Sequence, residues 1–217
     1  MVLPENPVEN LQRSLLAAAL TDALGAEWIK PQVLIASNLR IMVRVDGEVV
    51  VKSPNWFYVP QAKPMKEGVI RISYTPDLEG APVAVVMEFL SEKDYGELSV
   101  RSTPPYGKLY FYEEVLKVPT YVTYEPGEPS IEVRRLQNGK YKLEPPNEKG
   151  LFWIPELELF LGIWQGERLG QNINWLRWLD KSENLLLWNS EQAQQDRKRT
   201  ERLAAKLREL GVDPDSL

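Results

Sequence analysis

The chain has 217 residues, of which 43% are hydrophobic and 26% charged, so it is long enough to bury one substantial core with appendages. It contains no Cys and no His, which excludes disulfides, thiol nucleophiles, thiolate zinc sites and imidazole bases or ligands. The net charge of −5 argues against a constitutive nucleic-acid coat protein, although it does not exclude a nuclease. Carboxylates, amides, hydroxyls, Lys, Arg and Tyr remain for chemistry, and they suit hard cations such as Mg2+ or Mn2+.

A helix is predicted near the N-terminus. Asn6 can cap this helix, Pro7 suits its first position, and Glu9 stands three residues after the cap. An apolar stripe follows, and Gly25 is expected to end the helix. No apolar stretch approaches the roughly 20 residues needed to cross a bilayer, and the leader pattern of secreted proteins is not seen. We therefore expect a cytoplasmic protein that does not enter a membrane.

Strand signals follow in the segments QVLIA, LRIMVRV and EVVVKS. Asp46-Gly47 separates the last two segments and predicts a β-hairpin, because both central positions of the favoured turn require positive φ. The hairpin leads into SPNWFYVP, in which Pro54 and Pro60 bracket another short strand.

The segment VAVVMEFLS is almost continuously apolar, which predicts a strand covered on both faces. A helical segment from about Gly107 to Lys117 comes next, and PTYVTYEP then reads as a strand. The order strand, helix, strand is typical of a crossover unit in an α/β sheet.

A meander is predicted beyond Pro126, where SIEVRRL and KYKLEPP flank an Asn138-Gly139 turn. The phrase NINWLRWLDKSENLLLW reads as two short strands around a polar turn from Asp180 to Asn184. Most of the aromatic residues in this region are expected to contribute to the core rather than to bind a ligand.

The C-terminal part of the chain is different in kind. The segment from Ser190 to Leu210 is highly charged and lacks Gly and Pro, and Gly211 follows it, so it predicts a solvated helix with a defined end. Its apolar stripe is thin, so the helix either docks lightly on the domain or pairs with a copy of itself.

Glu88 stands inside the apolar strand VVMEFLS. A buried carboxylate is costly unless it is paired, hydrogen-bonded or bound to a cation, so Glu88 is a functional candidate. The alternative is a buried acid that a neighbouring Arg or Lys satisfies and that takes no part in chemistry. Asn55 lies at the mouth of another short strand, and these two polar side chains could share one metal ion.

Six segments of the chain, taken in order, resemble one known family, the Uma-two endonucleases, which belong to the PD-(D/E)xK nuclease superfamily. The resemblance covers almost the whole chain and is carried by KSPNWFYVP, VVMEFLSEKD, GKLYFYEEVLKVPTYVTYEP, IPELELFLGIWQGE, NWLRWLDKSENLLLW and LAAKLRELGVDPD. It implies a restriction-endonuclease fold and metal-dependent hydrolysis of DNA phosphodiester bonds.

The resemblance also implies a set of site residues. Pro54-Asn55 takes the place of the Pro-Asp motif whose aspartate binds metal, and Glu88 takes the place of the second acidic ligand. The superfamily lysine is expected two residues after that glutamate, where this chain has Leu90. Lys108, in GKLYFY, matches a lysine that has moved onto the following helix.

In this family pattern Glu88 would hold the metal, the carbonyl oxygen of Phe89 would add a ligand, and Lys108 would orient or activate the attacking water. Asn55 departs from the pattern, because an amide oxygen can ligate Mg2+ or Mn2+ but brings no negative charge. We therefore expect the cation to bind weakly.

Two acids on the loop after the Glu88 strand, Asp94 and Glu97, are candidates to compensate for the missing charge.

These observations predict an α/β (α+β) fold with a restriction-endonuclease-like mixed central sheet, flanking helices, extra β-hairpins and a C-terminal helix. The expected division is a nuclease-like domain over 1–189 and a charged helix and tail over 190–217. The predicted function is metal-dependent DNA cleavage, weakened by Asn55. The alternative is a catalytically inactive module for binding or for self-association, with homo-oligomers formed through the C-terminal helix.

Overall fold

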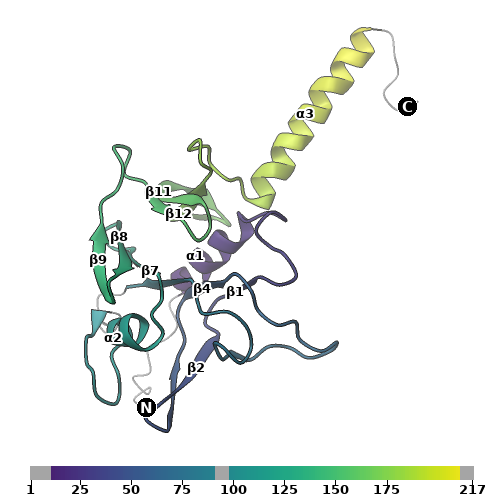
Figure 1. Ribbon diagram of the computed structural model, residues 1–217. Helices are drawn as coiled ribbons and strands as arrows, with labels where there is room; N and C mark the ends of the chain where they lie inside the picture. The colour runs from purple at the N-terminus through teal and green to yellow at the C-terminus, as the bar shows by residue number, and fades with distance from the viewer. Residues whose placement is uncertain (1–10, 91–97, 211–217) are drawn as a thin grey trace, which may run out of the picture.

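The computed structural model describes residues 11–90 and 98–210 of the chain (Figure 1). The helical elements are α1 (Leu11–Asp22), α2 (Lys108–Tyr110) with its π-helical continuation η2 (Phe111–Val115), and α3 (Asn189–Glu209). The strands are β1 (Leu34–Ala36), β2 (Arg40–Val45), β3 (Glu48–Lys52), β4 (Trp56–Val59), β5 (Ser73–Tyr74), β6 (Val85–Phe89), β7 (Thr120–Glu125), β8 (Ser130–Gln137), β9 (Lys140–Glu144), β10 (Phe152–Ile154), β11 (Leu159–Arg168) and β12 (Gln171–Leu179).

A mixed six-stranded sheet forms the centre of the molecule, in the order β1-β4-β6-β7-β8-β9. The pair β6–β7 is parallel and its other neighbouring pairs are antiparallel. The chain passes from β6 to β7 through α2 and η2, which confirms the predicted crossover unit. With two smaller sheets and the flanking helices, this arrangement confirms the predicted α+β fold of restriction-endonuclease type.

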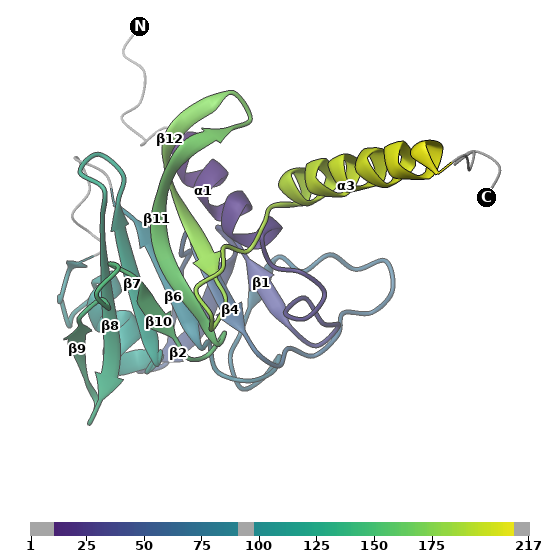
Figure 2. The same ribbon diagram turned by 90° about the horizontal axis from the view of Figure 1, so that it is seen from above.

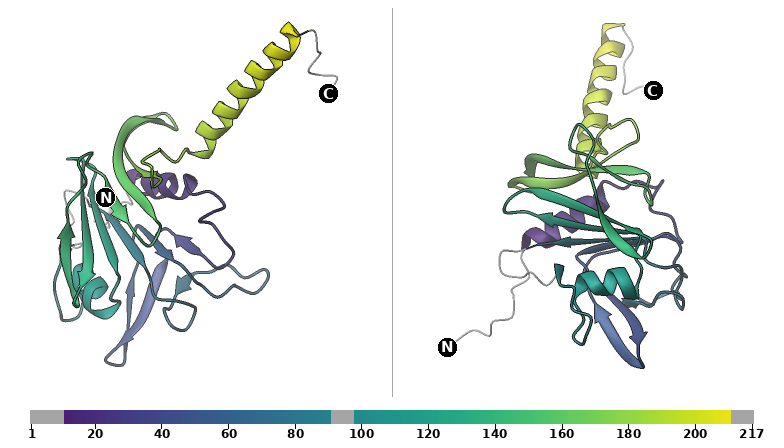
Figure 3. Two further views of the ribbon diagram at one scale, coloured as in Figure 1. Left: turned by 45° about the horizontal axis from the view of Figure 1, so that its top comes forward. Right: turned by 60° about the vertical axis from the view of Figure 1, so that its left-hand side comes forward.

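The two faces of the central sheet are covered by different elements (Figure 3). On one face, α1 and the sheet β10-β11-β12 pack against residues such as Trp56, Met87 and Val122. On the other face, α2, η2 and the sheet β3-β2-β5 pack against residues such as Phe57 and Val86. Alternate residues of β4 and β6 thus enter separate cores, which explains why both strands are apolar at almost every position.

Two-residue turns join three of the hairpins in the described part of the chain. Asp46-Gly47 connects β2 to β3 and Asn138-Gly139 connects β8 to β9, both with positive φ, so these two predicted turns are confirmed. The turn Leu169-Gly170 also has positive φ and joins β11 to β12, a long hairpin that arches over α1 (Figure 2). Sequence analysis missed this hairpin because Leu is not a typical residue for the first position of such a turn.

The prediction for the segment around Asp180 is half right. β12 is a nine-residue strand, and the polar turn from Asp180 to Asn184 forms as expected, closed by the hydrogen bond from Asp180 N–H to the Asn184 carbonyl oxygen. The predicted second strand is wrong, because only one bridge, Leu179 to Leu185, follows the turn. Trp188 instead turns inward and packs in the core.

The helices at the two ends agree with their predictions over the described residues. α1 ends at Asp22, shortly before Gly25, and its predicted start at Asn6 and Pro7 lies outside the described residues. α3 covers Asn189–Glu209 and projects from the body with no buried residue (Figure 1), and its predicted stop at Gly211 also lies outside. None of the helices in the described ranges has the length and apolar character required of a membrane span.

Candidate active site

Glu88 lies in the middle of the fold, on the central strand β6, where all five residues are buried. Its side chain has no exposed surface. Val86, two residues earlier on the same strand, belongs to the core cluster beneath α2 and η2, and strand alternation places Glu88 on that same face. The sequence therefore puts a carboxylate on the face of the sheet that the crossover helix covers.

Two donors from the crossover helix reach the Glu88 carboxylate. The Lys108 ammonium nitrogen lies 3.1 Å from Oε2, and the Tyr112 hydroxyl donates to Oε1 at 2.8 Å. Lys108 and Tyr112 are four residues apart, so both side chains extend from one face of the helix. This neighbourhood compensates the desolvation of the carboxylate, because a buried charge is tolerated when it is paired and hydrogen-bonded.

Tyr112 is itself buried in the core. Burial, and after it the negative charge of Glu88, raises the pKa of the Tyr112 hydroxyl well above its ordinary value. The hydroxyl therefore keeps its proton and remains a donor to the carboxylate.

Asn55 lies beside Glu88, but its side chain contacts the backbone of Phe89. Trp56 pairs with Met87 across β4 and β6, and extending this register by one residue sets Asn55 opposite Glu88. Its Oδ1 accepts a hydrogen bond of 2.7 Å from the Phe89 N–H, and its Nδ2 lies 3.4 Å from an oxygen of Asn38. The structure thus brings Asn55, Glu88 and Lys108 to one place, with Lys108 in direct contact with Glu88.

The position of Lys108 depends on the residue before it. Gly107 packs so closely on Ser99 that an added Cβ would lie 2.2 Å from the Ser99 carbonyl oxygen. The N–H of Gly107 donates to the Arg101 carbonyl oxygen, and the N–H of Tyr110 donates to the Ser99 carbonyl oxygen. The segment 98–107 therefore fixes where α2 begins, and with it the origin of the Lys108 side chain.

A second lysine near Glu88 was missed by sequence analysis. Lys52, the last residue of β3, is half-buried, and its ammonium group donates to the Tyr106 carbonyl oxygen at 2.5 Å. Burial and then the positive charge of Lys108 lower the pKa of Lys52, while the negative charge of Glu88 raises it. Lys52 is therefore influenced by the charges of both Lys108 and Glu88.

Of the two residues that were missed, Tyr112 and Lys52, only Tyr112 could have been found from the sequence. Tyr112 follows Lys108 at the i, i+4 spacing of one helix face, so it was accessible to inspection of the sequence. Lys52 gave no signal of this kind, because its proximity depends on how the β2–β3 hairpin packs against the crossover segment.

Among the described residues, the oxygen atoms available at this site suit a hard cation such as Mg2+ or Mn2+. They include only one carboxylate. Glu88 contributes the charge, while Oδ1 of Asn55 and the carbonyl oxygen of Phe89 are neutral. Mg2+ in proteins is commonly held by one or two carboxylates together with waters and substrate phosphate oxygens. This donor set therefore fits a cation that arrives together with a phosphate, rather than one held tightly beforehand.

The predicted compensating acids Asp94 and Glu97 lie outside the described residues. Within residues 11–90 and 98–210, no group of three Asp, Glu, His or Cys side chains is arranged to hold a metal ion.

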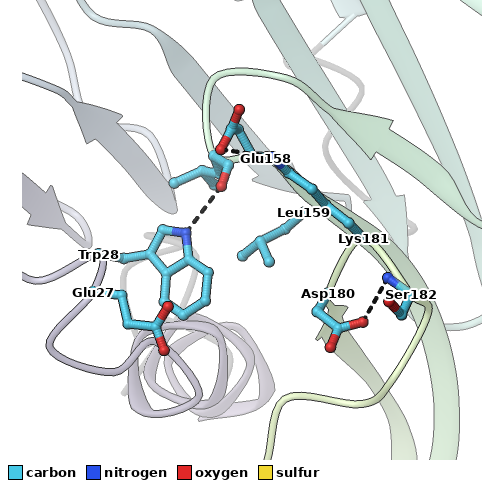
Figure 4. A pocket seen from close by; sticks show the side chains of 8 residues that line it. Glu27, Trp28, Glu158, Leu159, Asp180, Lys181 and Ser182 are labelled. Atoms are coloured by element: carbon cyan, nitrogen blue, oxygen red, sulfur yellow. Dashed lines mark hydrogen bonds and ion pairs between the residues drawn. The ribbon is translucent and has the colours of Figure 1, made fainter.

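A separate hollow lies between the segment after α1 and the turns that flank β11 and β12 (Figure 4). Two of its acidic residues are engaged locally: Glu158 pairs with Lys181 at 3.0 Å, and hydrogen bonds from Asn184 lower the pKa of Asp180. Trp28 closes one side and donates to the Leu157 carbonyl oxygen. None of the predicted site residues lines this hollow.

Comparison with known proteins gives one family. The family model Uma2, described as "Putative restriction endonuclease", matches residues 1–169. This range contains Asn55, Glu88, Lys108 and the whole central sheet, and it stops after β11. No curated protein matches the chain significantly.

Proposed function

The chain belongs to the Uma2 family, and from this premise we propose that it acts on the phosphodiester backbone of DNA at the site formed by Glu88, Lys108, Tyr112 and Asn55. The observation that carries the proposal is the contact of 3.1 Å between Lys108 and a carboxylate that has no exposed surface. A fully buried carboxylate paired with a partly exposed lysine suggests a function, because a well-packed apolar pair is often at least as stable.

Each residue of the site has a distinct part in the proposed reaction. Lys108 orients the attacking water and stabilises the negative charge that develops on the phosphate. Tyr112 holds the Glu88 carboxylate in place through its hydrogen bond. Glu88, Oδ1 of Asn55 and the carbonyl oxygen of Phe89 would hold Mg2+ or Mn2+, which supplies a water of lowered pKa and positive charge beside the phosphate.

Asn55 is expected to limit this reaction. Replacing a carboxylate by an amide removes one negative charge a few ångströms from a divalent cation, which costs about 2 to 8 kcal/mol of electrostatic attraction at high to intermediate dielectric. We therefore expect cleavage to require high concentrations of Mg2+ or Mn2+ and to be slow.

Cleavage of supercoiled plasmid tests the proposal. Purified protein is incubated with plasmid and Mg2+ or Mn2+, in parallel with Glu88→Ala and Lys108→Ala, and nicking is followed on gels. Glu167→Ala is the matched control, since Glu167 is an exposed acid on β11, in a different sheet. We expect the parent and the control to nick the plasmid and both site variants to lose most of the activity. Equal nicking by the parent and Glu88→Ala would overturn the proposal.

A second candidate function is a catalytically inactive module that keeps the nuclease fold for binding. Asn55 favours this alternative, because its Oδ1 already accepts a hydrogen bond from Phe89 N–H and brings no charge to a cation. The plasmid assay separates the two, since the inactive module would give no nicking by the parent at any cation concentration.

A further inference from the structure

The projecting part of α3 carries a charge opposite to that of the rest of the chain. Residues 197–208 contain six basic side chains and one acidic side chain, Glu201, so this stretch has a net charge of +5. The whole chain has a net charge of −5, so the remaining residues together carry −10. α3 has no buried residue, and this stretch extends away from the body (Figure 2). Positive charge is thus concentrated on one exposed helix of an acidic protein.

Three of these cations form a single row along the helix. Lys198, Arg202 and Lys206 are spaced four residues apart, which places them on one face and about 6 Å from one another along the helix axis. We call these three residues the basic row. All three are exposed, and within residues 11–90 and 98–210 none of them forms an ion pair. Like charges at this spacing destabilise an isolated helix, and an anionic partner would relieve their repulsion.

A second copy of α3 does not suit the helix as this partner. Leu203 and Leu207 follow the spacing of a coiled-coil seam, but Asp196 and Thr200 occupy the part of the same seam nearer the body. The described positions that flank the seam hold no acid, and they hold three cations: Arg197, Arg199 and Lys206. Two paired copies would therefore lack the opposite charges that favour a coiled coil.

Duplex DNA complements the basic row better than an anionic membrane does. Helices that lie in a membrane interface insert an apolar face that commonly includes Trp or Phe, and Asn189–Glu209 contains no aromatic residue. The basic row is straight and about 12 Å long, whereas duplex DNA carries one negative charge for about every 1.7 Å of its axis. The row can therefore face several phosphates at once.

We propose that the basic row of α3 binds the phosphate backbone of duplex DNA, as a contact separate from the Glu88 site. The choice of DNA rests on the proposed function, but the row includes no residue of that site. α3 is anchored beside α1, because the Trp188 indole N–H donates to the Ala19 carbonyl oxygen, and α1 covers the face of the sheet opposite to α2. The helix also lies beyond the family match, which ends at residue 169. Phosphate contacts of this kind hold a duplex without reading its base sequence.

Fluorescence anisotropy with a labelled DNA duplex in EDTA tests the basic row. The full chain is compared with the double variant Arg202→Gln, Lys206→Gln over a series of salt concentrations. We expect the double variant to bind about tenfold more weakly and to lower the slope of log affinity against log salt by about two, as for the loss of two phosphate contacts. The double variant Arg202→Lys, Lys206→Arg keeps both charges and should retain the binding.

Arg197→Gln, Arg208→Gln is the matched control, since it removes the same charge from the same helix. Both residues lie about 120° or more around the helix from Arg202 and Lys206. At about 0.15 M salt, charges on different faces of a helix are largely screened from one another, so the control should bind the duplex nearly as well as the parent. An equal loss in the two double variants would overturn the inference, as would unchanged binding by Arg202→Gln, Lys206→Gln.

The same variants are tested for cosedimentation with vesicles of phosphatidylserine and phosphatidylcholine. Binding of the vesicles that depends on the basic row, without binding of the duplex, would identify a membrane-binding helix and overturn the inference. Circular dichroism checks that α3 is retained, and Gln is chosen because it is a good helix former. If the double variant loses helix, Lys198→Gln takes its place, and the slope should then fall by about one.

The outcomes for DNA binding and for cleavage can be told apart. Duplex binding in EDTA that depends on the basic row, without plasmid nicking in Mg2+, would support the row and reject hydrolysis. Plasmid nicking in Mg2+ together with duplex binding that does not depend on the row would reject the row and leave hydrolysis standing.

Discussion

Glu88 keeps a carboxylate at a position without exposed surface, and Lys108 and Tyr112 make this possible. The free energy of the arrangement depends on both donors, since a buried acceptor that loses a partner retains the cost of its desolvation. The same two contacts also fix the direction of the carboxylate toward α2 and η2. Stability and the proposed chemistry therefore rest on the same side chains.

Tyr112→Phe isolates the role of the hydroxyl group. The substitution keeps the buried ring and removes the hydrogen bond of 2.8 Å to Glu88, so we expect the free energy of unfolding to fall by about 1.5 to 3 kcal/mol. Urea denaturation followed by tryptophan fluorescence measures this change. Tyr106→Phe is the control, because Tyr106 is only partly buried and its ring stacks on Tyr110. Equal stability of Tyr112→Phe and the parent would contradict the account of how Glu88 is held.

The crossover from β6 to β7 brings the site together at the scale of elements. Its helix begins at Lys108 because Gly107 allows the backbone to pack directly on Ser99. The β2–β3 hairpin contributes Lys52, which contacts the segment just before α2. Three segments that are distant in sequence thus place one charge each around the same position.

Gly107→Ala is predicted to disturb this placement without unfolding the sheet. Gly107 has a φ of −66°, which Ala adopts readily, so the effect comes from the Cβ that would lie 2.2 Å from a backbone oxygen. We expect DNA binding and cleavage to fall at least as far as in Lys108→Ala, while the circular dichroism spectrum is preserved. Gly25→Ala, where nothing lies within 4 Å of the added Cβ, tests whether any glycine substitution has this effect. Full activity in Gly107→Ala would show that α2 can shift without consequence.

The first turn of α3 is an integral part of the body, although the rest of the helix projects from it. The Arg177 guanidinium lies 3.5 Å from the centre of the Trp188 ring and forms an ion pair of 2.6 Å with Glu191. Glu191 also accepts a hydrogen bond from the Trp188 N–H, which caps the helix. The predicted domain boundary after residue 189 stays a prediction. The contacts of Arg177 and Trp188 with Glu191 extend across this boundary.

At the scale of the whole molecule, truncation can distinguish the contribution of the first turn of α3, which contacts the body, from that of the rest of the helix, which projects from it. We expect a chain ending at residue 195 to melt within about 2 °C of the full chain, because the described part that it loses contains no buried residue. A chain ending at residue 188 loses Glu191 and leaves Arg177 buried without its carboxylate. Allowing for the partial exposure of Glu191, this costs about 2 kcal/mol. The melting temperature should therefore fall by about 4 to 8 °C in a calorimetric scan.

The same pair of truncations tests the proposed self-association. If copies of the chain pair through α3, light scattering coupled to size exclusion should show an oligomer for the full chain and a monomer for the chain ending at residue 195. An oligomer in both would place the interface elsewhere.

Much of this molecule could be predicted from its sequence wherever the signal was local. Asp46-Gly47 and Asn138-Gly139 specify their turns through backbone conformation, and the apolar strand around Glu88 specifies its own burial. Lys52 could not be predicted as a neighbour of Glu88, because that proximity depends on how a hairpin packs against a distant segment. Leu169-Gly170 was missed because Leu, with a φ of 52°, adopts a conformation that its side chain does not favour.

In the proposed function Asn55 limits the activity of the site, and the most direct measurement uses the variant that places a carboxylate at this position. Plasmid nicking by Asn55→Asp is compared with nicking by the double variant Asn55→Asp, Glu88→Ala over a range of Mg2+ concentrations. We expect Asn55→Asp to nick faster than the parent and at lower Mg2+, and the added loss of Glu88 to abolish that gain. Equal cleavage by the double variant and Asn55→Asp would contradict the claim that Glu88 and residue 55 form one site for phosphodiester hydrolysis.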